Sequence, residues 1–462
     1  MTKLGKLLPA ILSLDSARDD GSARGDGLTR DSDLPWDVGS ARNDESLSYC
    51  LSERGENYAW YDDISRGQSS NLLDERHPER SRGILTLVIS ALLSVLFLSC
   101  QPEYITLQVR NPLEIERKGE IISILRSELP SLFDLPGEIS VIDQDSKQIL
   151  PSQKLDLDQD GAWDELLIMV DLGPLESREY IITPQASESI EPRVFGRLIP
   201  ERKDDFAWEN DRIAFRMYGP ALEQSGEISS GVDVWTKSVD KLIIDPWYAG
   251  DDYHKDHGEG GDFYKVGPTL GCGGLGLLVN DTLFTSRNFI QYRILADGPL
   301  RFVFELDYAS WGSADYKFTE TKRMSLDAGQ YFNLVESRLT GTDISSDSLR
   351  WVAGLASHPK QSPQAISLNS SGDYMSLYEA FKGANGWLGT AIIREPSNQK
   401  MPVIKYGDQF LFGLSPAEPL VPKYYAGAAW SKSPGMPDED SWIKYMKDFQ
   451  MRSVTPIIVE ID

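Results

Sequence analysis

Apolar and polar residues alternate with a period of two through most of the chain after residue 100. The alternation is clearest in five segments rich in β-branched and aromatic residues, at 105–111, 212–219, 289–311, 316–327 and 331–341. Asp-Gly and Gly-Pro pairs separate them, as expected for strands joined by turns. Helical patterns are confined to 375–382 and 440–449. The chain is therefore predicted to be mainly β, a large antiparallel β-sandwich with a smaller amino-terminal β unit.

A shift in composition near residue 192 predicts the small β unit at 101–192 and the main sandwich at 193–462. Residues 84–99 form an apolar run that is short for a membrane span, with Arg80 and Arg82 just before it. This order is typical of a secretory signal peptide, with a buried core helix as the alternative. Because Ser99-Cys100 resembles the lipobox of bacterial lipoproteins, we expect Cys100 to be lipidated and the protein to be anchored in the cell envelope.

Residues 1–83 are rich in Asp, Arg, Ser and Gly and show no sustained period. Such a composition buries too little apolar surface to offset the entropy of ordering. Two interpretations stay open for this extension. Either it precedes the true start codon, or it is a disordered tail on an internal anchor.

The formal net charge is −25 at pH 7, and most of it lies after residue 99. Nucleic acids and anionic lipid surfaces require clustered cations, so nucleic acid is excluded as a partner and membrane contact is expected only through the lipid anchor. A local pocket of arginine and lysine can still bind an acidic sugar. Only Cys272 follows Cys100, so the processed chain has no intramolecular disulfide.

Residues 245–276 combine two histidines, three tyrosines, six acidic residues and nine glycines in one stretch. Packing does not require this mixture, and glycines let the backbone approach a ligand closely. We therefore interpret the stretch as an active-site loop. Its candidate catalytic residues are His254, His257, Tyr253, Tyr264, Glu259 and Asp262, and its candidate substrate-binding residues are Trp247 and Lys265.

A second group of polar residues precedes this loop. Along the predicted strand at 212–218, Arg212, Arg216 and Tyr218 share one face, opposite an apolar face. Guanidinium groups there can grip a carboxylate through paired hydrogen bonds. The alternative is a salt-bridged structural strand. The further candidates for substrate binding around it are Glu209, Asn210 and Lys237.

An acidic segment at 155–166 has the spacing of a calcium loop. Its carboxylates recur at alternate residues and a glycine permits a sharp turn, but the EF-hand position for a bidentate glutamate is occupied by Leu167. A structural Ca²⁺ site and a metal-free acidic turn both remain open. The candidate ligands are Asp156, Asp158, Asp160 and Asp164.

No cofactor is required by any motif. His254-x-x-His257 with Glu259 and Asp262 offers a ligand set that a catalytic divalent metal can accept, although the spacing is not diagnostic. Surface histidines in an acidic loop are the alternative. The glycines at 271–276 lack the Gly-Lys-Ser/Thr of a phosphate loop, so we expect them to serve close packing.

Four motifs together resemble the bacterial family known as domain of unknown function 4861: AWENDRIAFRMYG, GVDVWTKS, DYHKDHGEGGDFYKVG and GCGGLG. The resemblance implies a secreted protein or lipoprotein of polysaccharide-degrading bacteria. It also implies an antiparallel sandwich similar to galactose mutarotase and to the β-domains of polysaccharide lyases.

The residues then predict a carbohydrate-active enzyme that cleaves a poly- or oligosaccharide containing uronate. In a lyase, Arg212 or Arg216 would hold the carboxylate, His254 or His257 would be the base, and a tyrosine would be the acid. In a glycoside hydrolase, two carboxyl groups would flank the scissile bond. A non-catalytic glycan-binding lipoprotein is the alternative, followed by a structural envelope protein.

Overall fold

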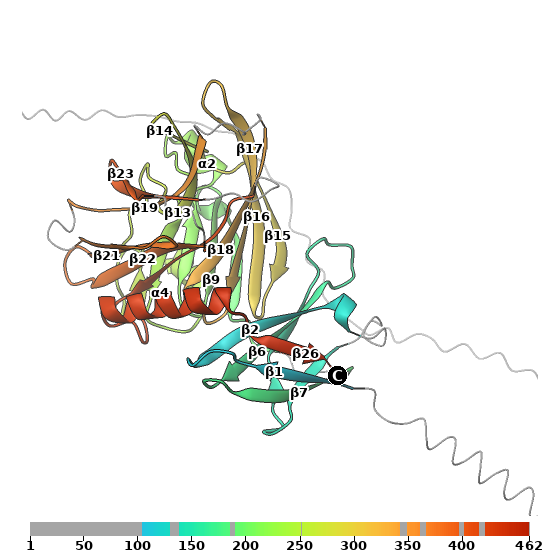
Figure 1. The fold of residues 1–462 in the computed structure, drawn as a ribbon. Coiled ribbons are helices and arrows are strands. Elements are labelled where there is room, and N and C mark those ends of the chain that lie inside the picture. Colours follow the sequence, from blue (N-terminus) through green and yellow to red (C-terminus); the bar gives the residue numbers. More distant parts are fainter. Residues whose placement is uncertain are drawn as a thin grey trace, which may run out of the picture. The chain divides into compact units, whose positions relative to one another are not determined.

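The computed structural model describes residues 104–129, 138–184, 190–250, 252–341, 349–360, 366–396, 402–414 and 421–461. The predicted extension at 1–83, the signal peptide and Cys100 lie outside these residues. In the described part the strands form five sheets with antiparallel ladders, which confirms the predicted mainly β fold (Figure 1). Within the same residues, no helix is both long and apolar enough to cross a membrane.

The amino-terminal region contributes two sheets around one core. The five-stranded sheet has the order β26-β1-β7-β3-β4, with β1 (Ile105–Arg110), β3 (Ser140–Asp143), β4 (Ile149–Leu150), β7 (Ser177–Thr183) and β26 (Ile458–Ile461). The three-stranded sheet has the order β2-β6-β5, with β2 (Arg117–Leu125), β5 (Ser152–Leu155) and β6 (Glu165–Leu172). Leu107, Ile168 and Ile182 are fully buried in their shared core.

Strand β26 joins the end of the chain to its amino-terminal region. The last strand of the chain pairs with β1, with Leu107 opposite Ile461. The sequence placed these residues in the main unit at 193–462. Local pattern cannot reveal this pairing, because the two strands are separated by almost the whole described chain.

A second five-stranded sheet, of order β12-β11-β10-β9-β8, carries the polar strand face predicted from the sequence. Its strands are β8 (Val194–Ile199), β9 (Asp205–Asn210), β10 (Ala214–Met217), β11 (Asp233–Lys237) and β12 (Gly260–Gly261). Phe215 and Met217 enter the large core, whereas Ala214 lies on the opposite face with Trp235. The predicted division of this strand into two faces is therefore confirmed.

The two remaining sheets complete the large core. One has the order β14-β13-β19-β24-β23, with β13 (Cys272–Val279), β14 (Thr282–Thr285), β19 (Leu349–Ala356), β23 (Ile404–Tyr406) and β24 (Gln409–Gly413). The eight-stranded sheet has the order β15-β16-β17-β18-β25-β22-β21-β20, with β15 (Gln291–Asp297), β16 (Arg301–Gly312), β17 (Lys317–Asp327), β18 (Phe332–Gly341), β20 (Ile366–Ser370), β21 (Tyr374–Ala380), β22 (Trp387–Arg394) and β25 (Lys423–Trp430). Phe206, Leu275 and Phe302 come from three different sheets and share one core.

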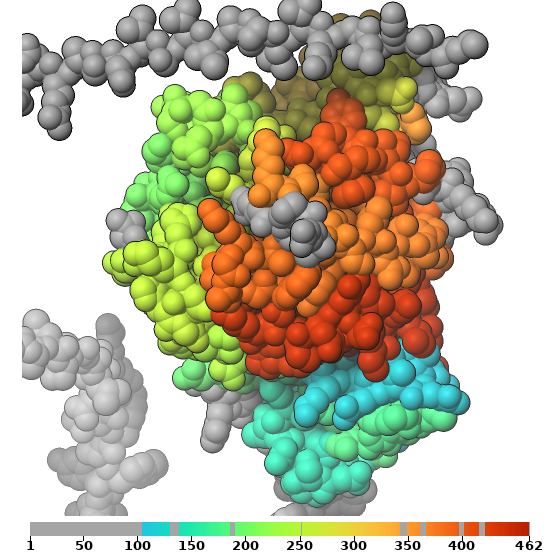
Figure 2. All heavy atoms as spheres, turned by 90° about the vertical axis from the view of Figure 1, so that its left-hand side faces the viewer, coloured from blue at the N-terminus to red at the C-terminus, as the bar shows by residue number. Residues whose placement is uncertain are grey.

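Helices are few in the described residues. They are the 3-10 helices η1 (Arg126–Glu128) and η3 (Pro200–Arg202) and the α-helices α2 (Pro220–Gln224), α3 (Ile244–Gly250) and α4 (Glu439–Val454). Helix α4 confirms the helix predicted at 440–449, and the Asp438 carboxylate caps it by accepting from the Ser441 amide at 2.9 Å. Near its end, Arg452 reaches Glu120 of β2 at 2.7 Å, where α4 and the amino-terminal strands touch (Figure 2).

The helix predicted at 375–382 is wrong, because these residues form strand β21. The strand pairs on both sides, with β20 and β22. Tyr374 to Glu379 are all buried, so the segment shows no exposed polar face that would reveal a period of two. Pairing on both edges overrides the local helical preference of residues such as Leu377 and Glu379.

Candidate functional site

The polar face of the β8–β12 sheet is covered by α3 and by the loop that contains the histidines. Trp235 of β11 stacks on Tyr253 of the loop at 4.7 Å and on Trp247 of α3 at 5.9 Å between ring centroids. Strand β12 draws the loop against β11, and Gly260 there has φ +124°. A Cβ at Gly260 would lie 2.0 Å from the Thr236 carbonyl oxygen, so this close approach requires glycine.

Arg216 joins the strand to the histidine loop. Its Nη2 atom donates to Asp233 Oδ2 at 2.6 Å and to Asp262 Oδ2 at 3.0 Å, and Asp233 is its direct partner across the ladder. The two patches that the sequence predicted to converge therefore meet at Asp262. Only 5% of the Arg216 side chain is exposed, so its role is to organise the carboxylates rather than to reach a substrate.

Three carboxyl groups surround this one arginine, since Asp205 Oδ2 also lies 3.9 Å from Arg216 Nε. Burial raises the pKa of Asp205 to about 6. Burial likewise raises the pKa of Asp262, and burial together with the charge of Asp262 raises that of Asp233. Because their pKa values are raised, these three carboxyl groups together favour keeping a bound proton near neutral pH.

His254 lies on the outer side of this buried cluster. Its Nδ1 atom is 3.4 Å from Asp262 Oδ2, its ring packs on Tyr253 at 4.6 Å, and 64% of its side chain is exposed. Among the described residues, no hydrogen bond of the other ring nitrogen, Nε2, is found. An exposed imidazole backed by a buried carboxylate is an arrangement suited to proton transfer.

Arg202 completes the group and was missed by reasoning from sequence. Its Nε atom donates to the Tyr253 hydroxyl at 3.1 Å. Within the described part of the chain, its Nη atoms donate no hydrogen bond. Arg202 ends the short helix η3, fifty-one positions before Tyr253, and no local pattern links the two. Tyr253 is itself only 7% exposed, whereas Arg202 is half-buried and His254 is exposed. Arg202, Tyr253 and His254 are called the outer triad below.

His257 and the other acidic residues of the loop have partners nearer the surface. His257 Nε2 lies 3.4 Å from Asp252 Oδ2, and 66% of its side chain is exposed. Glu259 pairs with Lys241 at 2.5 Å and accepts from Trp247 Nε1 at 3.5 Å. These contacts tie down the edges of the loop. Trp247 itself is half-buried.

Glu209, Asn210 and Lys237, predicted to bind substrate, are completely buried. Lys237 Nζ donates to Glu209 Oε2 at 2.7 Å and to the Asn210 carbonyl at 2.7 Å. Glu209 also accepts from the Ile243 and Ile244 amides at the start of α3. Glu209 and Lys237 therefore hold the helix on the sheet, whereas the Asn210 side chain donates to the Asp327 and Gln330 carbonyls. A substrate would reach Glu209 and Lys237 only if α3 moved away.

Arg212 and Arg216 do not act together as the sequence suggested. Arg212 precedes β10, has 32% of its side chain exposed, and lies at the edge of two cavities that it shares with Arg193. The ring of Tyr218, by contrast, lies 5.4 Å from the Arg216 guanidinium carbon. Burial raises the pKa of the half-buried Tyr218 hydroxyl.

Tyr264 and Lys265 lie beside a histidine to which the sequence assigned no role. Tyr264 is buried and its ring meets His358 edge-on at 5.1 Å. His358 Nδ1 bonds Glu379 Oε1 at 2.5 Å and Nε2 bonds the exposed Lys265 through its carbonyl oxygen at 2.7 Å. Burial opposes the charged imidazole, but Glu379 outweighs it and raises the pKa of His358. Since both ring nitrogens face acceptors, His358 is a structural cation.

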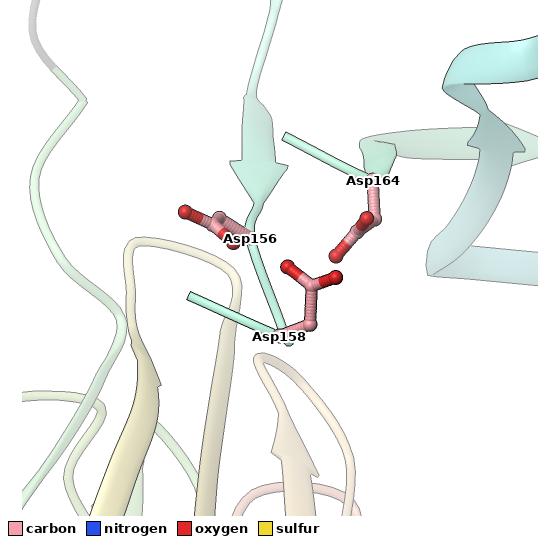
Figure 3. Close-up of side chains that lie close together, drawn as sticks. All are labelled: Asp156, Asp158 and Asp164. Atoms are coloured by element: carbon pink, nitrogen blue, oxygen red, sulfur yellow. The ribbon is translucent and has the colours of Figure 1, made fainter. Parts of the chain in front are cut away.

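The acidic loop brings together three of the four predicted calcium ligands. Carboxylate oxygens of Asp156, Asp158 and Asp164 lie within 4.8 Å of one another, and those of Asp158 and Asp164 face each other (Figure 3). Asp160 lies outside this set and accepts from the Ala162 amide at 2.7 Å. Oxygen ligands from carboxylates suit a hard cation such as Ca²⁺.

The chain is similar to a curated relative and, more distantly, to several solved structures. A protein of Formosa agariphila described as "Uncharacterized protein P7" is 33% identical over 396 residues, covering 80% of this chain and 97% of its own length. An alpha-mannosidase from Enterococcus faecalis V583 has a TM-score of 0.40 at 10% identity, covering 83% of this chain and 50% of its own. A glycosyl hydrolase family 38 protein from Enterococcus faecalis has a TM-score of 0.39 at 10% identity, covering 82% and 52%.

The chain thus spans about half the length of each of those two structures, and similarity at this level carries no argument about activity. Residues 109–459 match the family described as "Domain of unknown function (DUF4861)". That range includes every strand and helix around the outer triad. The chain belongs to the DUF4861 family.

Proposed function

We propose that this protein is a carbohydrate-active enzyme that cleaves an acidic poly- or oligosaccharide by β-elimination at the outer triad. The observation that carries the proposal is the joining of an arginine, a tyrosine and an exposed histidine through two contacts, Arg202 to Tyr253 and Tyr253 to His254. Elimination next to a uronate carboxylate needs a cation, a base and an acid in one place. The triad supplies one group for each role.

The roles follow from the contacts of each side chain. Arg202 binds the substrate carboxylate with its Nη atoms, which stabilises the charge that develops when the neighbouring proton leaves. His254 Nε2 takes the proton from C5, and Asp262 behind Nδ1 stabilises the imidazolium. The C4–O bond breaks as a C4=C5 double bond forms, and Tyr253 gives its hydroxyl proton to the leaving oxygen. Solvent then returns the proton from His254 to Tyr253.

Arg216 and Asp233 are positioning residues in this scheme. Arg216 binds Asp262 at 3.0 Å and thereby fixes the carboxylate on which His254 rests. Asp233 binds the same Nη2 atom at 2.6 Å and holds the guanidinium in place. Neither side chain has more than 5% of its surface exposed.

Hydrolysis is supported less well by the same geometry. A glycoside hydrolase needs two accessible carboxyl groups on opposite sides of the scissile bond. Asp262 and Asp233 are buried and bind the same arginine nitrogen. The more exposed Glu259 is engaged by Lys241 at 2.5 Å. Among the described residues considered above, elimination is therefore the reaction that the grouping of Arg202, Tyr253 and His254 supports better.

We further propose a structural Ca²⁺ held by Asp156, Asp158 and Asp164. What supports it is the grouping of three carboxylates, whose mutual repulsion a divalent cation would relieve. The loop lies between β5 and β6 of the amino-terminal unit and supplies no base other than carboxylates. Calcium there would stabilise the fold and take no part in the elimination.

The reaction is tested by incubating the protein with uronate-rich polysaccharides and following both ultraviolet absorbance and reducing ends. Elimination produces an unsaturated uronate that absorbs in the ultraviolet, whereas hydrolysis produces reducing ends alone. Binding without either product would leave a glycan-binding protein. Growth of both signals together is the result that the proposal expects.

A further inference from the structure

The structure contains a cationic cleft separate from the outer triad. It is a cavity of about 450 Å³ lined by residues of the amino-terminal sheets and by Arg193 and Arg212 of the main unit. Four cationic side chains line it, Lys118, Arg178, Arg193 and Arg212, together with the carboxylates of Asp143 and Asp171. The volume is within the range of small-ligand pockets.

Two of these cations already have acidic partners at close range. Arg178 binds Asp143 at 3.1 Å and Glu176 at 2.8 Å. Arg193 binds Asp211 at 2.5 Å, and its Nη1 atom lies 2.9 Å from Met169 Sδ. These two side chains are held in place and shape the wall of the cleft.

Lys118 and Arg212 are different. No ion pair of Lys118 is found among the described residues, and its side chain is exposed. The nearest recorded ion pair of Arg212 joins Nε to Asp211 Oδ2 at 4.0 Å, and the same carboxylate is already bound by Arg193. The cleft thus holds two cations whose charge is not matched at hydrogen-bonding distance. The chain as a whole has a net charge of −25, so these two cations stand against an acidic background.

A second cavity shares Arg193 and Arg212 with the cleft. That cavity, of about 550 Å³, is lined by Arg193, Arg212 and Lys241 among others. Lys241 pairs with Glu259 of the histidine loop at 2.5 Å. The two cavities therefore share Arg193 and Arg212, and a residue of the second cavity contacts the histidine loop.

We propose that the cationic cleft binds an oxyanion, a carboxylate or a sulfate, carried by a saccharide, with Lys118 and Arg212 as its main contacts. Guanidinium pairs with such groups through two hydrogen bonds, and the ammonium of Lys118 adds a point charge. The proposal that the cleft binds an oxyanion is based only on the charged side chains of the cleft. The saccharide part rests on the proposed function and makes the cleft an additional anchoring site for an acidic chain.

The test is isothermal titration of the full chain with glucuronate, inorganic sulfate and glucose at constant ionic strength. We compare the wild type, the double variant Lys118→Ala/Arg212→Ala, and Arg350→Ala as a matched control. Arg350 is 45% exposed and pairs with Asp281 on a different surface. We expect glucuronate to bind the wild type and the control, glucose not to bind, and the double variant to lose at least about tenfold in affinity.

The outcomes separate the parts of the proposal. Equal glucuronate binding by the double variant and the wild type would overturn the site, provided circular dichroism shows both folded. Sulfate binding that is as tight as glucuronate and lost in the double variant would overturn the saccharide part and retain the oxyanion site. His254→Ala should bind glucuronate at the cleft unchanged. If the wild type binds glucuronate but shows no elimination, only the proposed function is refuted. If elimination occurs and the double variant still binds glucuronate as the wild type does, only the cleft is refuted.

Discussion

Arg216 and Arg212 are four positions apart and were predicted to share one strand face, yet only Arg216 lies in β10, and the fold uses the two in opposite ways. Arg216 is buried among Asp205, Asp233 and Asp262, whereas Arg212 is about one-third exposed and its nearest ion pair spans 4.0 Å. The period of two in the sequence predicts which residues share a strand face. What lies over that face determines whether a cation organises the fold or meets solvent.

The cover over Arg216 has an identifiable cause. Glu209 accepts from the first amides of α3 at 2.7 Å and so holds this helix over Trp235. The histidine loop follows and seals the face with Tyr253. Arg212, at the beginning of the segment, lies beyond this cover and lines the cleft. Substitution of the buried Arg216 is therefore expected to lower the free energy of unfolding far more than substitution of Arg212.

The largest effect is expected from Arg216→Met. It leaves three buried carboxyl groups without their cation, and breaking a buried ion pair from one side costs about 3–5 kcal/mol. Arg212→Met should change the free energy of unfolding by about 0.5 kcal/mol or less, since exposed pairs contribute little. Urea denaturation of both variants measures the contrast. Similar small losses in both would contradict the assignment of Arg216 as the centre of the buried cluster.

His358 tests whether a second buried cation follows the same rule. His358→Ala removes both its bond to Glu379 and its bond to the Lys265 carbonyl, and leaves Glu379 buried. We expect a loss of about 1–3 kcal/mol in the free energy of unfolding. The matched variant His257→Ala, on an exposed histidine, should unfold like the wild type. If His358→Ala were equally neutral, its cationic role would be refuted.

The pH dependence of stability tests the proton balance around Arg216. The folded pKa of Asp205, about 6, is above its ordinary value of 3.8. Its contribution to the free energy of unfolding is therefore complete below about pH 4 and is lost as the pH rises through about 6. Asp205→Asn keeps an acceptor for the Gly219 amide and should flatten this decline. An unchanged slope in the variant would show that Asp205 is not the titrating group.

The exposed acidic loop gives the smallest expected effect. Added Ca²⁺ should raise the melting temperature by a few degrees, and a chelator should reverse the rise, because a ligand of the folded state stabilises it. Asp158→Asn should abolish the response, whereas Asp145→Asn, an exposed aspartate elsewhere, should retain it. The same response to Mg²⁺ and Ca²⁺ would argue against a calcium site.

Patterns with a short period were readable from the sequence, and contacts between distant segments were not. The two faces of the segment around Ala214 and the helix ending near Phe449 follow from periods of 2 and 3.6. Strand β21 was misjudged because both of its faces are buried. The pairing of β26 with β1 depends on chain topology, which no local pattern encodes.

The candidate site divides in the same way. The composition of the loop pointed to His254, Tyr253 and Asp262, which lie close together. The polar strand segment before the loop pointed to Glu209 and Lys237, whose residue types suit a substrate equally well until their burial is known. No sequence motif indicated Arg202, because its proposed role depends on its hydrogen bond to the Tyr253 hydroxyl. Residue type thus indicated the chemistry, and burial separated the binding groups from the structural ones.

The most direct test of the outer triad is the rate of ultraviolet absorbance increase with a uronate-rich polysaccharide for His254→Ala. Its matched control is Lys255→Ala, the exposed neighbour whose ammonium pairs with Asp252 at 3.1 Å. We predict that His254→Ala loses at least about 100-fold in rate with an unchanged melting temperature, as expected for a removed general base. Lys255→Ala should keep the wild-type rate. Turnover by His254→Ala at the wild-type rate would contradict the proposed elimination at this site.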